Sequence, residues 1–187
     1  MREFNHTIAV VFLISIILVT GSCKNAEKQK SDLHQIEPSG ETGLNIGDTA
    51  PTFSHTDISG DTITLVNFKN DVVLLYFWAS WCPNCKKINP HLADLYRKYK
   101  DKTFPSGGKF EIISFSLDDK DDAWRKIASD ELPWKVHVSD QHDAIAVTAA
   151  MYQVMAIPHS LLLAPGNVIV AKNEKPAKLA EILQQMR

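Results

Sequence analysis

Two of the three cysteines, Cys82 and Cys85, stand close together in the stretch Trp-Cys-Pro-Asn-Cys. They follow an almost continuous apolar run at residues 71–78 and precede a stretch whose apolar residues have helical spacing. At positions i and i+3 in the first turn of a helix, two sulfurs can meet in a disulfide that is readily reduced. Cys82 would lie at the helix N-terminus, where free backbone N–H groups and the dipole stabilise a thiolate. Because the thiolate attacks in disulfide exchange, the pattern predicts Cys82 as the nucleophile and Cys85 as the resolving thiol.

Other uses of a CxxC pair fit this sequence less well. A zinc site needs two further ligands, and the histidines that could supply them are dispersed along the chain. Haem attachment requires a histidine directly after the second cysteine, and that position is Lys86. A structural disulfide is possible in an exported protein, but a bridge across so few residues adds little stability. Redox chemistry is therefore the interpretation that the pair favours.

The elements around the pair alternate between strand and helix. Residues 71–78 are rich in β-branched and aromatic side chains, as in a central strand covered on both faces. A helix is expected next, at 83–100. The later elements expected are a strand at 110–117, a helix opened by the acidic group at 118–122 and ending at Ser129, a strand at 134–138, a helix at 143–152, strands at 161–164 and 168–172, and a last helix from Pro176. This order predicts an α/β fold.

The composition excludes several classes of protein. The 187 residues are 44% hydrophobic and 22% charged, which is typical of a globular chain and not of a disordered one. The length fits one domain with accessory segments. The net charge of −2 gives no indication of a nucleic-acid partner. Three cysteines are too few for a small domain held together by disulfides.

Residues 1–22 have the pattern of a secretory signal. A basic residue near the start is followed by an apolar run at 8–19 that is shorter than the roughly 20 residues needed to span a bilayer. The small residues before Cys23 resemble the lipobox of bacterial lipoproteins, although Thr20 stands where that motif usually has Leu. This resemblance implies cleavage before Cys23 and its lipidation. The alternatives are an ordinary cleaved signal with an incidental cysteine, or an uncleaved anchor.

The rest of the chain divides into a tether and a folded domain. Residues 23–43 are polar, contain Pro and Gly, and show no apolar period, so a flexible tether is expected there. The folded domain is expected at 44–187. With a lipid at Cys23, the protein would be held at a membrane of the bacterial cell envelope and face the periplasm.

Residues 77–85, FWASWCPNC, with Pro90 five positions further on, resemble the thioredoxin superfamily. Within it, residues 44–187 are similar to the TlpA/ResA-like thiol–disulfide oxidoreductases of bacterial envelopes. The resemblance implies a thioredoxin-like fold with a central mixed β-sheet flanked by helices and a TlpA-like central insertion. It also implies no cofactor other than the redox-active disulfide between Cys82 and Cys85, and no bound metal.

The same resemblance assigns the substrate-binding residues. The segment Ala-Ile-Pro that ends at Pro158 matches the family's segment with a cis proline opposite the CxxC pair. Substrate contacts are therefore expected from Trp81, Pro83, Asn84, Ile157 and Pro158.

The sequence departs from the family at the groups that move protons. Tyr76 stands where thioredoxins carry a buried Asp, and Ile88 stands where many TlpA/ResA-like proteins carry Glu. This leaves Asn89, His159 or water as candidates for proton transfer. His159 also replaces the usual Thr after the cis proline, so it is either a group that tunes the thiol pKa or a residue of the surface rim.

The function implied by the resemblance is that of an exported thiol–disulfide oxidoreductase acting on disulfides of exported proteins, in the reductive direction. A membrane-bound electron donor or acceptor is the expected redox partner. The dipeptide Pro83-Asn84 resembles the Pro-His of strong oxidants more than the Gly-Pro of thioredoxin, which leaves the direction open.

Two alternatives share the fold. Peroxiredoxin-like peroxidases share the segment Gly-Asp-Thr-Ala-Pro at 47–51, but they place Pro-x-x-x-Thr-x-x-Cys around the reactive cysteine. Copper chaperones use Cys-x-x-x-Cys with a distant histidine, and the spacing here is one residue shorter.

Overall fold

The computed structural model describes residues 36–119, 121–139 and 144–187. The expected signal, Cys23 and most of the expected tether lie outside the described residues. In the part of the chain that is described, no helix is both long and apolar enough to cross a bilayer.

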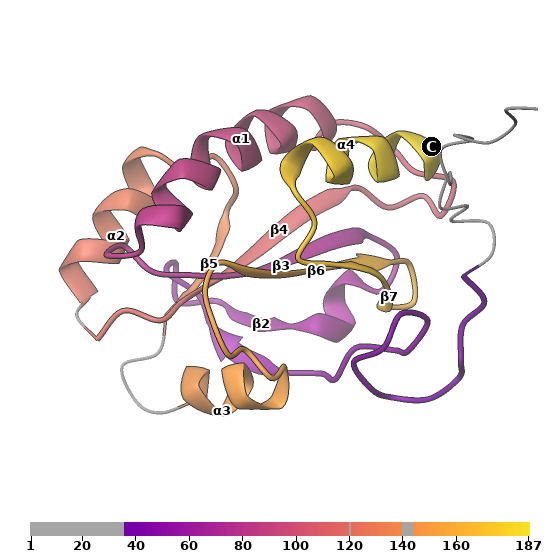
Figure 1. The fold of residues 1–187 in the computed structure, drawn as a ribbon, viewed down its shortest axis with the longest axis horizontal. Helices are drawn as coiled ribbons and strands as arrows, with labels where there is room; N and C mark the ends of the chain where they lie inside the picture. The colour runs from indigo at the N-terminus through magenta and orange to yellow at the C-terminus, as the bar shows by residue number, and fades with distance from the viewer. Residues whose placement is uncertain (1–35, 120, 140–143) are drawn as a thin grey trace, which may run out of the picture. The chain divides into compact units, whose positions relative to one another are not determined.

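A five-stranded mixed sheet forms the centre of the domain (Figure 1), in the order β5-β4-β3-β6-β7. The central strand β3 (Val72–Trp78) runs parallel to β4 (Phe110–Ser116) and antiparallel to β6 (His159–Ala164). At the edges, β5 (Val136–Ser139) runs parallel to β4, and β7 (Val168–Lys172) runs antiparallel to β6. All residues of β3 are buried, as the apolar run predicts for a strand covered on both faces.

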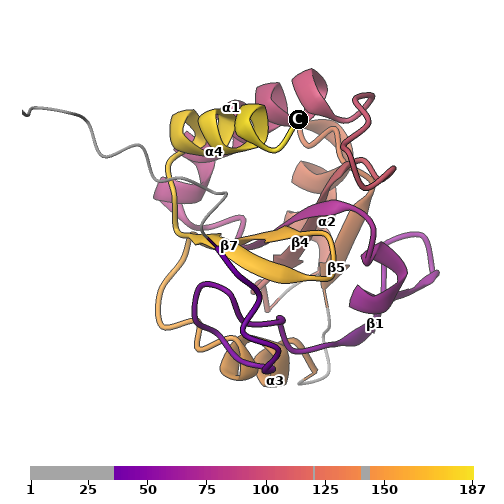
Figure 2. The same cartoon turned by 90° about the vertical axis from the view of Figure 1, so that its right-hand side faces the viewer.

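Helices α1 (Pro83–Tyr99) and α4 (Pro176–Gln185) cover one face of the sheet, as both views show (Figures 1 and 2). Trp124 of α2 (Asp121–Asp130) is buried in the hydrophobic core that α1 and α4 form with this face of the sheet. Helix α3 (Ala144–Met151) lies on the opposite face. That face is also covered by the hairpin of β1 (Ser54–Thr56) and β2 (Thr62–Thr64), with the 3-10 helix η2 (Leu65–Phe68) following β2.

The alternation of side chains along β3 divides the core into two clusters. Leu74, Tyr76 and Trp78 pack beneath α1, where they meet the buried residues of that helix. Leu75 and Phe77 pack on the face that α3 covers. The expected thioredoxin-like fold, with a mixed sheet between helices, is therefore confirmed.

The structure differs from the sequence-based expectation in three places. Residues 39–43 were expected to belong to the tether, but they are hydrogen-bonded through their backbone to residues 47–49, so the folded domain begins before residue 44. The strands β1 and β2 and the 3-10 helix were not expected, because each has only three or four residues and shows no clear apolar period. Helix α2 begins at Asp121, so the expectation that it opens with the whole acidic group at 118–122 was wrong. Asp118 instead lies in the turn after β4 and accepts hydrogen bonds from serine residues.

Candidate active site

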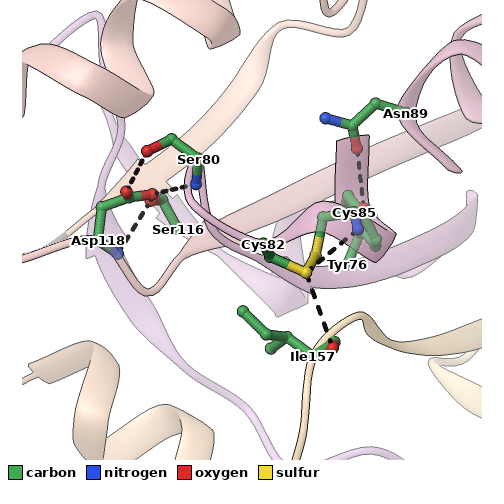
Figure 3. The surroundings of a disulfide bond; sticks show 8 residues. All are labelled: Tyr76, Ser80, Cys82, Cys85, Asn89, Ser116, Asp118 and Ile157. Carbon is green, nitrogen blue, oxygen red and sulfur yellow. Dashed lines mark hydrogen bonds between the residues drawn. A yellow bond between two sulfur atoms is a disulfide. The ribbon is translucent and has the colours of Figure 1, made fainter. Parts of the chain in front are cut away.

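The CxxC pair lies at the junction between β3 and α1. Strand β3 ends at Trp78, and Pro83 is the first residue of α1, a position where its missing N–H leaves no helical hydrogen bond unmade. Cys82 is the N-cap residue of the helix, and it forms a disulfide with Cys85 (Figure 3), across a Cα–Cα distance of 5.2 Å. The sequence prediction of a strand, a turn and a helix around the pair is therefore confirmed.

The two sulfurs have different surroundings. The backbone N–H of Cys85 donates to Sγ of Cys82 at 3.1 Å, so the sulfur of Cys82 takes the capping position that an oxygen usually fills. The same N–H group would stabilise a negative charge on this sulfur after reduction. Cys85 has no exposed surface, whereas Cys82 retains 4%. This asymmetry favours Cys82 as the group that an incoming disulfide meets first.

The turn before β6 faces the disulfide. The peptide bond between Ile157 and Pro158 is cis, as the family resemblance implies. The carbonyl oxygen of Ile157 lies 3.8 Å from Sγ of Cys82, so the turn and the CxxC pair form one site (Figure 3). Ile157 and Pro158 are half-buried, and Pro83 and Asn84 are exposed, which leaves all four open to a bound chain.

Two exposed apolar side chains belong to the same two segments. Trp81 precedes the first cysteine and is 61% exposed. Met155 precedes the cis proline by three positions and is 92% exposed. Trp81 was expected as a substrate contact, whereas Met155 was not, since a methionine in an apolar segment has no mark of exposure in the sequence.

Tyr76 and Asn89 form a buried pair on the α1 face of the sheet. The Tyr76 hydroxyl donates to Oδ1 of Asn89 at 2.8 Å. Burial raises the pKa of Tyr76 far above its ordinary value, so the phenol stays neutral. A cavity of about 60 Å³ adjoins Tyr76 and is also lined by Ile88, Pro158 and Glu174. The two positions at which the family carries a buried acid therefore hold a neutral phenol, which is hydrogen-bonded to Asn89, and the apolar side chain of Ile88.

His159 is placed on the opposite side of the sheet from α1. It stands directly opposite Phe77 in the β3–β6 pairing, and the two ring centroids are 6.1 Å apart. Phe77 belongs to the cluster on the α3 face. Burial, and then the positive charge of Lys172, lower the pKa of His159. A role of His159 in tuning the thiols stays a prediction, and its packing against Phe77 gives that role no direct support.

A buried carboxylate holds the turn that leads into the CxxC pair. Asp118 is 8% exposed. Its Oδ1 accepts from the Ser80 hydroxyl at 2.5 Å, and its Oδ2 accepts from the Ser80 backbone N–H at 2.8 Å and from the Ser116 hydroxyl at 2.6 Å. This cluster was not expected from the sequence, because Ser80 and Asp118 are brought together only by the pairing of β3 with β4.

Among the residues with described positions, no group of three or more His, Cys, Asp or Glu side chains is placed to hold a metal ion. The chemistry that the site carries on these residues is the exchange of two thiols for a disulfide.

Comparison with known proteins supports this assignment. Residues 70–169 match the model of a protein family described as thioredoxin-like. The thiol–disulfide oxidoreductase ResA of Bacillus cereus is 32% identical over 158 residues, which cover 82% of this chain and 86% of that protein.

Solved structures show the same relationship. The thioredoxin domain of a thiol–disulfide oxidoreductase from Bacteroides vulgatus matches with a TM-score of 0.67 and 31% identity, over 76% of this chain and 98% of that one. A thiol:disulfide interchange protein from a Bacteroides species matches with a TM-score of 0.66 and 31% identity, over 76% and 90% of the two chains. The chain therefore belongs to the thioredoxin-like family and is a thiol–disulfide oxidoreductase of the ResA type, with Cys82 and Cys85 as its CxxC pair.

Proposed function

We propose that this oxidoreductase reduces disulfides of exported proteins, with Cys82 as the nucleophile and Cys85 as the resolving thiol. In the first step the Cys82 thiolate attacks one sulfur of the substrate disulfide. The substrate S–S bond breaks, a mixed disulfide with Cys82 forms, and the released substrate thiolate takes up a proton. The backbone N–H of Cys85, 3.1 Å from Sγ of Cys82, supports this role for Cys82 and is the observation that carries the proposal.

The second step returns the protein to its oxidised form. Cys85 loses its proton and its thiolate attacks Sγ of Cys82. The bond between Cys82 and the substrate breaks, and the second substrate thiol leaves. Two electrons have then passed from the dithiol to the substrate, and a dithiol donor must reduce the Cys82–Cys85 disulfide again. The donor we propose is a membrane-bound protein, in keeping with the expected position of the chain at the membrane.

The contacts of Cys82 support the reductive direction. One N–H group stabilises its thiolate, but the carbonyl oxygen of Ile157 at 3.8 Å repels a negative charge on the same sulfur. The residues between the cysteines, Pro83 and Asn84, carry no charge. A thiolate with limited stabilisation gives a dithiol that gives up its electrons readily, whereas strong oxidants owe their potential to a stabilised reduced form.

The experiment that tests the direction is the reduction potential of the Cys82–Cys85 pair against glutathione. A reductase should equilibrate near the roughly −270 mV of thioredoxin, and a value near −120 mV would make the protein an oxidant. Peroxide turnover and an equimolar copper titration of the reduced chain test the two alternative functions. We expect neither catalytic peroxide consumption nor stoichiometric copper binding.

Attachment through Cys23 is part of the same proposal. Residues 39–43 are hydrogen-bonded to residues 47–49 of the domain, so a tether from Cys23 would have about 15 residues. As a flexible coil it would have a root-mean-square reach of roughly 20 Å, which would let an anchored domain meet membrane proteins. Intact-mass analysis of the membrane fraction should show a mature chain that begins at a diacylated Cys23. Cys23→Ala should abolish this species and leave disulfide reduction in solution unchanged. A soluble chain with a free Cys23 thiol would contradict the anchor and leave the redox proposal intact.

A further inference from the structure

Ser80 and Asp118 extend the pairing of β3 and β4 beyond the ends of the two strands. In the parallel register, Val72 lies opposite Phe110 and Trp78 lies opposite Ser116. The same offset of 38 positions separates Ser80 from Asp118. The backbone ladder ends with the bond from the Leu117 N–H to the Trp78 carbonyl, at 2.8 Å. Beyond this bond the two segments are joined by the Asp118 carboxylate, which accepts hydrogen bonds from both the N–H and the hydroxyl of Ser80.

We propose that Asp118 is a positioning residue of the redox centre, and that its carboxylate fixes the turn at residues 79–82 and thereby the place of the Cys82 sulfur at the N-terminus of α1. The proposal rests on the proposed function in one respect, which is that Cys82 is the nucleophile.

The turn depends on few other contacts of its own. Trp81, its third residue, is 61% exposed and so adds little packing. Besides the bonds of Ser80, one backbone hydrogen bond lies within the turn, from the Cys82 N–H to the Ala79 carbonyl at 3.1 Å. The other links of the turn are at Cys82, whose carbonyl accepts from the Lys86 N–H at 3.1 Å and whose sulfur is bonded to Cys85. Ala79 and Ser80 are buried, and Ser80 lies two residues before Cys82. A shift at Ser80 is therefore passed along the backbone to the sulfur that must remain within reach of the Cys85 N–H.

The carboxylate itself is held from the β4 side. Ser116 donates its hydroxyl to Oδ2 of Asp118 at 2.6 Å and accepts the Asp118 backbone N–H at 3.2 Å (Figure 3). Hydrogen bonds to a charged acceptor are shorter and stronger than those between neutral groups. Asp118 thus joins the end of β4, a rigid element, to the turn that carries the first cysteine.

Three substitutions separate positioning from a simple effect of charge. Asp118→Ala removes the acceptor and the charge. Asp118→Asn removes the charge but keeps a carbonyl oxygen for the Ser80 N–H. Ser80→Ala removes only the hydroxyl and leaves the backbone bond to Asp118. Ser114→Ala is the matched control, since Ser114 is a buried serine of β4 whose hydroxyl joins His137 and Trp134 instead of the CxxC turn.

The measurement is the pH dependence of alkylation of Cys82 in the reduced full-length chain, with the melting temperature recorded for each variant. Positioning predicts that Asp118→Ala raises the pKa of the Cys82 thiol, because the thiolate loses its place beside the helix N–H groups. A rise of one unit lowers the thiolate fraction at pH 7, and with it the alkylation rate, by up to about tenfold. Ser80→Ala should shift the profile in the same direction by a smaller amount. Asp118→Asn should stay near the wild-type profile, as should Ser114→Ala, even where melting temperatures fall.

Two results would overturn the proposal. In the first, Asp118→Ala and Asp118→Asn lower the thiol pKa equally while Ser80→Ala has no effect, which is the signature of a removed negative charge. In the second, all variants keep the wild-type profile and only their stability changes. If Asp118→Ala does not fold, Ser80→Ala decides in its place, because a wild-type profile for that variant contradicts positioning. Faster alkylation of Cys85 than of Cys82 in the unmodified chain would instead contradict the proposed function.

Discussion

Sγ of Cys82 lies 3.8 Å from the carbonyl oxygen of Ile157, a residue 75 positions further along the chain. This contact joins the β3–α1 junction to the turn before β6, which are neighbours because β3 pairs with β6. A substrate segment that reaches Cys82 therefore meets both the N-terminus of α1 and the cis-proline turn. The exposed side chains of Trp81 and Met155 belong to these two segments.

The two cysteines should differ sharply in reactivity. Cys82 accepts the N–H of Cys85, and Cys85 is fully buried, so alkylation of the reduced protein near pH 7 should label Cys82 well before Cys85. Cys85→Ser should accumulate mixed disulfides with substrates, because no second thiol is left to release them. Cys82→Ser should accumulate few. Mass spectrometry of trapped complexes checks both outcomes, and preferential trapping by Cys82→Ser would reverse the roles.

Met155 should contribute to substrate affinity. Its side chain is 92% exposed, and partial burial beneath a bound protein would contribute about 1 kcal/mol. Met155→Ser should therefore raise KM for a protein disulfide substrate roughly fivefold, with kcat little changed. Val66→Ser is the control, since Val66 is also exposed, at 58%, but lies on the 3-10 helix after β2. An equal effect of the two substitutions would contradict a specific role for Met155.

The parts of the site that follow local rules could be predicted from the sequence. The apolar run of β3 and the helical spacing of α1 place Cys82 at a helix N-terminus without knowledge of any other element. The assignment of Pro158 needed the family resemblance, because an Ile-Pro step by itself shows only where a strand starts.

Contacts across the sheet could not be predicted in this way. The binding of Ser80 by Asp118 depends on the register between β3 and β4, which no short stretch of sequence encodes. The acidic residues after β4 look like a helix start, since carboxylates are favoured there. The structure instead uses the first of them, Asp118, as a buried acceptor, and α2 begins three residues later.

The pair of Tyr76 and Asn89 should matter for stability. Tyr76→Phe removes the donor and leaves Oδ1 of Asn89 buried without its partner, which should lower the free energy of unfolding by about 1–3 kcal/mol. Adding Asn89→Leu to this variant should recover part of the loss, because both polar groups are then gone. Urea denaturation of the two single variants and the double variant measures this coupling.

The same variants test whether the phenol takes part in proton transfer. Because burial keeps Tyr76 neutral, Tyr76→Phe should leave unchanged the pH profile for release of the mixed disulfide by Cys85. A shift of that profile with no change in the profile of Cys82 alkylation would assign Tyr76 a place in the proton route.

His137 should make the stability of the domain depend on pH. Its ring lies between the Ser114 hydroxyl and the Trp134 carbonyl, each at 2.8 Å, and burial lowers its pKa from 6.5 to about 4. Between these two values the unfolded chain binds a proton that the folded chain does not. The contribution of neutral His137 to the free energy of unfolding is therefore fully present above pH 6.5. It is lost as the pH decreases toward 4, by roughly 3 kcal/mol in total.

Comparing His137→Gln with the wild type isolates this contribution. His159 acts in the same direction because its pKa is also lowered, whereas burial raises the pKa of Glu111, which acts in the opposite direction. Both groups are retained in the variant. The two proteins therefore differ in how steeply the free energy of unfolding changes with pH only through the protonation of His137. Urea denaturation at pH 7.5, 6, 5 and 4.5 should give a shallower decline for His137→Gln. His91→Gln, at an exposed position on α1, should keep the wild-type slope, and an equal decline in all three proteins would show that His137 is protonated in the folded state.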